Sequence, residues 1–384
     1  IRDRLRGVWY FNLAYLWGDV PLFLHAEQPA DIYKPRTPVA QIWEQVIADF
    51  TAATALPKRS EYSEEDTGRV TSGAAYAMLG RTYWYNRDFE NVYKMLYVLV
   101  EGEQKGEYEL DPDFATQWLN PNSNLRESIF EIQYVTNGKN WDESTGWNGV
   151  WFIPSSDGGY GFHLPTQHLL DAFDPEDPRI TWTFVRQGDQ FVGNDFVTGD
   201  ANYPSRFFDR KHFVPMSETL NAASPVYPQD VEMTVYVIRY ADVLLMYAEA
   251  CLEKGDIVGA RKYLNQVRKR ARESSPLDAK RVIQKYVPDT KPTSLPDITS
   301  DNVAEVRLAI WNERRFEFAC EGIRRMDLMQ QERYGEIMTA VYSNGYATED
   351  VDKGRYYTKE RELFPIPQND IDLSRGALVQ NPGY

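Results

Sequence analysis

Apolar side chains recur at intervals of three and four along residues 1–17, which is the spacing that predicts one apolar face of a helix. Gly18 suits the left-handed conformation at the end of such a helix, and Pro21 blocks its continuation. The same spacing recurs over residues 38–56, with Pro38 at a first-turn position. The chain is therefore expected to begin with two amphipathic helices. Their apolar positions are Leu5, Val8, Trp9, Leu13 and Leu16 in the first, and Ile42, Trp43, Val46, Ile47 and Phe50 in the second.

Two later segments, residues 73–100 and 239–271, resemble each other. Each places small and apolar residues on one helix, passes through a polar turn at residues 86–88 or 255–256, and then repeats the stripe on a second helix. Small residues at the contact positions let paired helices approach closely. This arrangement is typical of tetratricopeptide-type repeats, in which each pair buries its stripe against a neighbour, although such arrays normally hold three or more repeats.

A further long helix is predicted over residues 302–334, where charged residues interleave with a continuous apolar stripe. Glu321 and Arg325 stand four apart and could pair on its surface. The charges could form an active-site network or a partly buried ion network that ties the helix to its neighbours. The ion network is favoured because the charges follow the apolar stripe. The charged residues are Glu313, Arg314, Arg315, Glu317, Arg324, Arg325 and Asp327.

The rest of the chain lacks these long helical patterns. Residues 105–232 hold short strand-like runs such as SIFEIQYV, turns bounded by proline, and one short helix after Thr166. Residues 275–300 form a proline-punctuated connector, and the last stretch, RELFPIPQNDIDLSRGALVQNPGY, is expected to be mostly extended. The sequence thus predicts a mainly α fold, with tetratricopeptide-like helix pairs as a scaffold and an irregular, loop-rich half. Binding residues are expected in that half, because they concentrate on loops held by rigid elements.

Charge and apolar run lengths exclude several classes of protein. With 57 acidic against 42 basic residues, the 384-residue chain carries a net charge of −15, which opposes binding to nucleic acid and to anionic lipid. No apolar run approaches the roughly 20 residues of a membrane-spanning helix. Cys251 and Cys320 cannot form a disulfide framework by themselves, so two buried free thiols are favoured over a single bridge.

Aromatic residues are abundant, with 10 Trp, 25 Tyr and 18 Phe, and three of the tryptophans lie in the glycine-rich stretch NGKNWDESTGWNGVWFIPSSDGGYGF, which has no periodicity that could bury them all. Flat aromatic faces stack on the apolar side of a pyranose ring, and nearby polar groups bond its hydroxyls. The stretch therefore predicts a sugar-binding patch, with Trp182 as a further candidate; the alternative is that the tryptophans fill an irregular core. The candidate ligand-binding residues are Trp141, Asp142, Glu143, Trp147, Asn148, Trp151 and Tyr160. The tryptophans of the helical stripes, expected to pack inside, are Trp9, Trp17, Trp43, Trp84 and Trp311.

Signatures of catalysis and of metal binding are missing from the sequence. It holds no serine nucleophile elbow, no phosphate-binding glycine loop, no paired histidine spacing for zinc and no intact EF-hand loop. No catalytic residue, metal ligand or cofactor is therefore expected; calcium on oxygen-rich turns stays open, but no ligand spacing indicates it. Acidic residues near the tryptophans could imitate the carboxylate pair of a glycoside hydrolase, which keeps an enzyme as a less favoured alternative. The 4 histidines, expected at the surface or as caps in unrelated contexts, are His25, His163, His168 and His212.

Several blocks of sequence together resemble the SusD/RagB family. They are LRGVWYFNLAYLWGDVPLF, RVTSGAAYAMLGRTYWY, GFHLPTQHLLDAFDPEDPR, VIRYADVLLMYAEACLEKGD with its LNQVRKRA sequel, NERRFEFACEGIRRMDLM, and LFPIPQNDIDLS with the terminal NPGY. They occur in the family's order and span essentially the whole chain. The resemblance implies a helical fold with tetratricopeptide-like pairs packed against an irregular ligand-binding half. It also implies a lipid-anchored protein on the outer-membrane surface of Bacteroidetes-type bacteria, which captures nutrient oligomers over a SusC-like TonB-dependent transporter.

The resemblance leaves two matters to inference. The family's signal peptide, lipid-bearing cysteine and first helical segment would precede Ile1, so the lipid anchor is inferred. Ligand-contacting residues vary between family members, so the candidate patch rests on local chemistry. The expected function is non-enzymatic capture of an oligomer, with a glycan favoured over a peptide. The expected organisation is one SusD-like domain over residues 1–384 that lacks its N-terminal segment, helical at about 1–104, 234–274 and 302–334, and irregular and ligand-binding at about 105–233 and 335–384.

Overall fold

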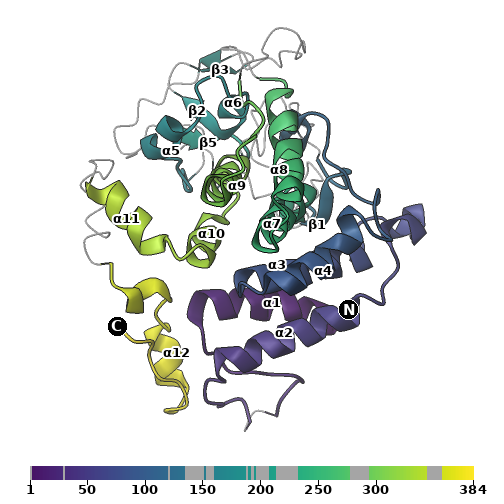
Figure 1. Cartoon of the computed structure of the whole chain (residues 1–384). Helices are drawn as coiled ribbons and strands as arrows, with labels where there is room; N and C mark the ends of the chain where they lie inside the picture. Colours follow the sequence, from purple (N-terminus) through teal and green to yellow (C-terminus); the bar gives the residue numbers. More distant parts are fainter. Residues whose placement is uncertain are drawn as a thin grey trace.

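Helices dominate the part of the chain that the computed structural model describes (Figure 1), which confirms the mainly α fold class. That part comprises residues 2–28, 31–119, 122–134, 151–152, 160–186, 189–191, 194–195, 207–212, 232–276, 294–343 and 357–384. The helices are α1 (Arg2–Trp17), α2 (Val39–Ala53), α3 (Ser72–Tyr85), α4 (Phe89–Val100), α5 (Gln167–Ala172), α6 (Ile180–Thr183), α7 (Tyr240–Glu253), α8 (Ile257–Arg272), α9 (Val303–Glu317), α10 (Arg324–Gln330), α11 (Tyr334–Ser343) and α12 (Gln368–Leu373). The strands are β1 (Ser128–Ile132), β2 (Phe184–Arg186), β3 (Gln190–Phe191), β4 (Asn194–Asp195), β5 (Phe207–Asp209) and β6 (Val235–Arg239).

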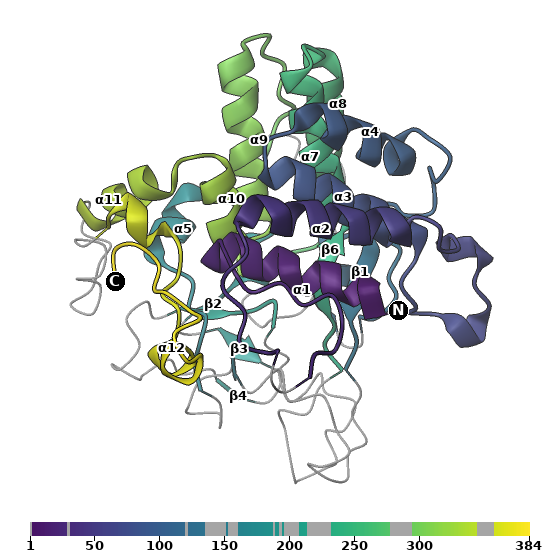
Figure 2. The ribbon, with the colours of Figure 1, turned by 90° about the horizontal axis from the view of Figure 1, so that it is seen from below.

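The helices pack around a large apolar core. α1 contacts α2, α2 contacts α3, and α3 lies against both α4 and α7. α7 in turn packs on α8 and α9, so helices far apart in the sequence share one interior (Figure 1). Figure 2 shows α1 and α2 crossing the molecule side by side below α3. The core side chains of these helices include Trp84, Leu96, Leu245 and Val306, each 0 % exposed.

The first two helices form where the apolar stripes predict them. α1 ends as expected, because Gly18 adopts a φ of +72° and donates its N–H to the carbonyl of Ala14 at 2.9 Å. α2 is shorter than predicted at both ends. Pro38 is the N-cap, with an extended ψ of 136°, and does not belong to the first turn. At the other end, the N–H of Thr54 bonds the carbonyl of Thr51 and closes the helix with a tighter turn.

The two predicted helix pairs are confirmed as α3 with α4 and α7 with α8, and their turns are built alike. In the first pair, Arg87 adopts a φ of +60° and Asp88 accepts a hydrogen bond from the N–H of Asn91 at 3.2 Å. In the second, Gly255 adopts a φ of +85° and Asp256 accepts from the N–H of Gly259 at 2.8 Å. A left-handed residue thus ends one helix, and the aspartate that follows caps the next.

Close approach within the first pair depends on Gly80. A Cβ added there would lie 2.2 Å from Cδ2 of Leu96 on α4. We expect Gly80→Ala to destabilise the protein. Overpacking lowers the free energy of unfolding by about 1–3 kcal/mol, whereas the higher helix propensity of alanine raises it by about 1 kcal/mol at most. Urea denaturation measures the change. Leu96→Ala removes the atoms with which the new Cβ would clash. The double variant Gly80→Ala/Leu96→Ala should therefore lose less stability than the sum of the two single losses, and additive losses would contradict this account.

The single helix predicted over residues 302–334 is wrong. α9 ends at Glu317, and three residues of turn and a bend precede α10. Cys320 and Gly322 adopt φ values of +64° and +76° in this break. A left-handed residue cannot continue an α-helix, so the apolar stripe carries on through two separate helices.

Because of this break, the predicted pair of Glu321 with Arg325 does not form. Glu321 instead accepts from Lys211 at 2.7 Å and from Arg239 at 2.8 Å. Arg325 donates to the backbone carbonyl of Glu362. One continuous helix would have brought these two charges together. Instead, Glu321 connects the break after α9 to one part of the fold, and Arg325 connects α10 to another.

A buried ion network surrounds Glu317 at the end of α9. Its Oε1 lies 2.6 Å from Arg239 and 2.5 Å from Arg270, and its Oε2 lies 2.9 Å from Arg179. Arg239 and Arg270 also share Glu127, each at 2.6 Å. Burial by itself would raise the pKa of Glu317, but the charges of Arg270, Arg239 and Arg179 outweigh it and hold that pKa below its usual range. The predicted ion network is confirmed, and it is more deeply buried than expected.

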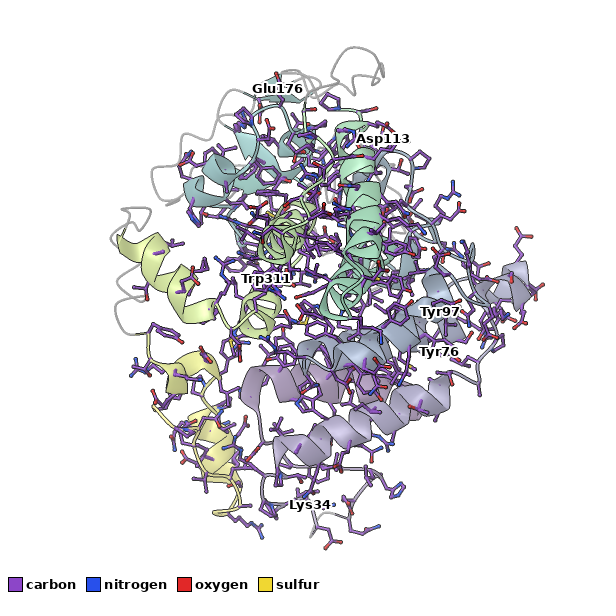
Figure 3. All side chains as sticks on the ribbon, in the orientation of Figure 1. Lys34, Tyr76, Tyr97, Asp113, Glu176 and Trp311 are labelled. Atoms are coloured by element: carbon purple, nitrogen blue, oxygen red, sulfur yellow. The ribbon has the colours of Figure 1, made fainter. Side chains whose placement is uncertain are left out.

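A second buried cluster joins α3, α7 and α9. Arg314 of α9 lies 2.6 Å from Asp242 of α7. Glu249 of α7 accepts from the indole N–H of Trp84 at 2.6 Å and from that of Trp311 at 2.9 Å. Trp311, on α9, is labelled in Figure 3. Polar groups buried at this depth are stable only when they have partners, so these contacts fix how the three helices meet.

The irregular half is held by short ladders. β1 pairs antiparallel with β6, β2 with β5, and β3 with β4. The short helix predicted after Thr166 is α5, and Thr166 caps it by accepting from the N–H of Leu169 at 3.2 Å. The final stretch is less extended than expected, since it contains α12. Among the described helices, none has both the length and the apolar character needed to cross a membrane.

The two cysteines are free thiols, as predicted. Cys251 is buried in α7, and its burial raises the pKa of the thiol to about 12. Cys320 is only partly buried, which differs from the expectation of two buried thiols. Its place in the break after α9 accounts for the difference, because the predicted helix would have put it on the apolar stripe.

Candidate functional site

Three exposed aromatic rings lie in contact on the irregular half. Trp151 is 47 % exposed, Tyr160 57 % and Phe162 54 %. The centroid of the Trp151 ring lies 5.2 Å from that of Tyr160 and 5.8 Å from that of Phe162. The plane of Phe162 is tilted by 17° from each of the other two. We call these three residues the aromatic platform.

Two short pieces of backbone hold the platform together. The N–H of Phe162 donates to the carbonyl of Trp151 at 2.7 Å. Gly161 has a φ of +63°, a conformation that glycine adopts without steric cost, and His163 follows with a φ of +60°. With a left-handed residue on each side of it, Phe162 exposes its ring to solvent while the His163 ring is directed at Asp209.

The platform rests on a layer of packed rings. Phe152, next to Trp151, stacks on His212 with centroids 4.7 Å apart and an interplanar angle of 30°. The His212 ring lies 6.4 Å from Trp118, which is 1 % exposed and belongs to a buried aromatic cluster. The exposed rings are therefore connected through Phe152 and His212 to the interior.

Asp209 is the centre of this layer and is fully buried. The pairing of β2 with β5 places it opposite Phe184 at the end of β5. Its Oδ1 accepts from the backbone N–H of Lys211 at 2.8 Å. Its Oδ2 lies 2.7 Å from Nδ1 of His212 and 3.1 Å from Nδ1 of His163.

This geometry shifts the pKa values of Asp209 and His163. Burial would raise the pKa of Asp209, but His212 and His163 beside it hold that pKa well below its usual range. The hydrogen bond to Asp209 in turn raises the pKa of His163. The expectation that the histidines stand in unrelated contexts is therefore wrong for these two. They are far apart in the sequence, and only the fold brings them to one carboxylate.

The platform can bind a flat, partly apolar ligand. Exposed rings in contact with one another offer apolar surface to the C–H side of a sugar, and each aromatic contact contributes about 0.5–1.5 kcal/mol beyond area burial. The alternative that the tryptophans fill an irregular core is wrong for Trp151, which is 47 % exposed.

The sequence prediction and the structure overlap in part. Trp151 and Tyr160, both predicted, lie together in the platform. Phe162 was missed, although its place next to Gly161 in the same glycine-rich stretch is the signal that could have found it. The remaining candidates, which lie outside the described residues, are Trp141, Asp142, Glu143, Trp147 and Asn148.

Two other tryptophan predictions are wrong. Trp182 was a candidate ligand residue, but it is 0 % exposed and donates its indole N–H to the carbonyl of Ser275 at 2.7 Å. Trp9 was expected to pack, but it is 69 % exposed. α1 buries the neighbouring face that carries Tyr10 and Phe11, and the apolar spacing did not separate these two faces.

A separate apolar groove of about 600 Å³ lies between the end of α1 and the C-terminal segment. Trp17 lines it on one side, and Ile366 and Leu373 line it on the other. Neither Trp151 nor Tyr160 contributes to it. The groove is therefore a second candidate binding surface, apart from the platform.

Comparison with known families agrees with this architecture. The profile described as "SusD family" matches residues 126–384. The chain belongs to the SusD family. A second profile, described as "Starch-binding associating with outer membrane", matches residues 4–84 of this SusD-family protein.

Relatives and solved structures extend the likeness over nearly the whole chain. A SusD-like protein of Bacteroides ovatus is 24 % identical over 421 residues, covering 98 % of this chain and 72 % of that protein. The structure of a SusD homolog from Bacteroides thetaiotaomicron superposes with a TM-score of 0.78 at 22 % identity, covering 100 % of this chain and 78 % of the other. Surface glycan-binding protein A from Bacteroides thetaiotaomicron, solved in complex with laminarihexaose, gives 0.73 at 22 % identity, with 99 % and 77 % coverage. These likenesses show that the SusD-family fold is shared.

Proposed function

We propose that this SusD-family protein binds a nutrient glycan at the cell surface, without cleaving it, through the aromatic platform. The observation that carries the proposal is the exposure of Trp151, Tyr160 and Phe162 in mutual contact. Apolar rings of this size are normally buried, and an exposed group of them marks a binding surface. Their exposure favours a sugar over a ligand that needs an enclosed pocket.

A β-glucan is the first ligand to test. A glycan-binding protein of the same fold was solved with laminarihexaose, which supports an oligosaccharide as the ligand class. Each ring contact is weak, so affinity should be modest and should rise with the number of sugar units that reach the platform.

The family also supports the cellular setting that we propose. The profile that matches residues 4–84 is described as associating with the outer membrane. We place the protein there through a lipid anchor upstream of Ile1, with the bound oligomer passed to a SusC-like TonB-dependent transporter. The protein's role is then capture and presentation, and the chemistry of cleavage belongs to other proteins.

Native gels that contain single polysaccharides test the function. We expect laminarin or another neutral glycan to slow the protein, and laminarihexaose to bind more tightly than laminaribiose in calorimetry. Reducing-end release after long incubation should stay at the level of a protein-free blank. Migration unaffected by every glycan of the panel, or steady release of reducing ends, would contradict the proposal.

Peptide capture is the second candidate, and the apolar groove is the observation that favours it. Trp17, Ile366 and Leu373 could hold apolar side chains of a peptide. A peptide library is the matching probe. If peptides bind and Leu373→Asp abolishes that binding while glycans have no effect, the second candidate replaces the first.

A further inference from the structure

We propose that His163, Asp209 and His212 form a zinc site beneath the aromatic platform. One ligand atom of each residue, an imidazole nitrogen or a carboxylate oxygen, lies within 4.8 Å of the other two. Two imidazoles and one carboxylate are a donor set typical of Zn²⁺ sites with an open coordination position. The proposal concerns a metal site and does not depend on which ligand the platform binds.

The spacing of the donor atoms suits a metal of this size. Around a tetrahedral Zn²⁺ with bonds of about 2.0–2.1 Å, neighbouring ligand atoms lie about 3.3 Å apart. Oδ2 of Asp209 lies 3.1 Å from Nδ1 of His163 and 2.7 Å from Nδ1 of His212. These two spacings are shorter than the tetrahedral value by about 0.2 and 0.6 Å, and the three ligand atoms all lie within 4.8 Å of one another, so small side-chain movements would admit the ion with Nδ1 of each imidazole as the donor.

The carboxylate is already oriented for this role. Oδ1 of Asp209 accepts from the backbone N–H of Lys211, which leaves Oδ2 directed at the two imidazoles. Contacts of this kind from outside the ligand set position a metal ligand and tune its affinity. The charged end of Lys211 is directed away, to Glu321 and to the carbonyl of Glu317. It therefore does not occupy the position of the ion.

The surroundings give the site one buried and one accessible side. The side chains of Asp209 and His212 are 0 % and 13 % exposed, whereas that of His163 is 41 % exposed. Phe152 stacks on His212 and limits the movement of its ring. Water or a ligand group can therefore complete the coordination from the side of His163.

The site lies under the segment that carries the platform. His163 directly follows Phe162 of the platform, and Phe152, which stacks on His212, directly follows Trp151. A metal bound to His163 would connect this segment to the end of β5. The sequence alone does not reveal the site, because His163 is far from Asp209 and His212 along the chain.

Calorimetry with zinc chloride on EDTA-treated, dialysed protein without a histidine tag tests the site. We expect one equivalent of Zn²⁺ to bind, and Ca²⁺ to bind at least tenfold more weakly because it prefers oxygen ligands. Replacing both His163 and His212 with asparagine should weaken zinc binding at least tenfold. His25→Asn, at an exposed position outside the site, should leave it unchanged.

A second readout separates the site from chance surface binding. Co²⁺ should give visible absorption of a tetrahedral, nitrogen- and oxygen-bound ion in the wild type and lose it in the double variant. If the double variant does not fold, the single variant His163→Asn serves, since that side chain is 41 % exposed. Absence of stoichiometric zinc binding, or equal binding by wild type and variant, overturns the proposal.

Discussion

Replacing Glu317 with glutamine is expected to lower the free energy of unfolding by about 3–5 kcal/mol, the usual loss when one partner of a buried ion pair is removed. The carboxylate lies within 2.5–2.9 Å of Arg270, Arg239 and Arg179, and all four side chains are nearly or completely buried. Glutamine keeps the shape but removes the negative charge. The buried arginines would then share less negative charge, supplied only by their other close partners. Those partners are Glu127, Glu321, Glu313 and Asp177.

Urea denaturation at pH 7 measures this loss, and an exposed ion pair provides the control. Glu332 lies 3.0 Å from Arg87, but the side chains are 76 % and 47 % exposed. Glu332→Gln should therefore change the free energy of unfolding by no more than about 1 kcal/mol. Similar losses in Glu317→Gln and Glu332→Gln would show that burial does not set the strength of the network.

The pH dependence of stability follows from the same group. The pKa of Glu317 is lowered in the folded protein relative to its ordinary value of 4.5. The unfolded state therefore binds the proton more readily, and the contribution of Glu317 is complete above about pH 4.5 and is lost as the pH falls below it. Glu317→Gln should flatten this part of the stability curve. An unchanged acid slope in the variant would contradict the lowered pKa.

Glycan binding should weaken by at least about 30-fold when Trp151 and Phe162 are both changed to alanine. This factor corresponds to about 2 kcal/mol, the loss expected when central aromatic anchors of a binding surface are truncated. Both rings are about half exposed, so their removal leaves the packed layer beneath in place. Calorimetry with laminarihexaose, or with whichever glycan slows the wild type in gels, measures the effect.

Trp9→Ala is the matched control for this prediction. Trp9 is 69 % exposed and lies on α1, outside the platform. Loss of an exposed indole there should leave glycan affinity unchanged, and thermal melts of all variants should agree within a few degrees. If the platform variant binds as the wild type does, the platform is not the glycan site and that part of the proposal is wrong.

Local rules accounted for the helices and for several of their ends, but not for the break after α9 or for the partners of its charged residues. The pairs α3–α4 and α7–α8 follow from apolar spacing and from Asp88 and Asp256 as caps, all of which act within a few residues. The break at Cys320 and Gly322 was missed, because the apolar stripe continues across it. Glu321 is drawn instead to Arg239 and Lys211 on other segments, an arrangement that spacing along one helix cannot predict.

The amino-acid sequence by itself determined the mainly α architecture, the two helix pairs, the family, and the glycine-rich stretch in which exposed rings lie. These features depend on periodicity, capping residues and local backbone freedom, which are properties of neighbouring residues. Only the tertiary structure decided that Trp151 and Phe162 are exposed while Trp182 is buried, and that His163 meets His212 at Asp209. Exposure and contact between distant residues depend on which surfaces the packed helices and strands cover, and that is set by the whole fold.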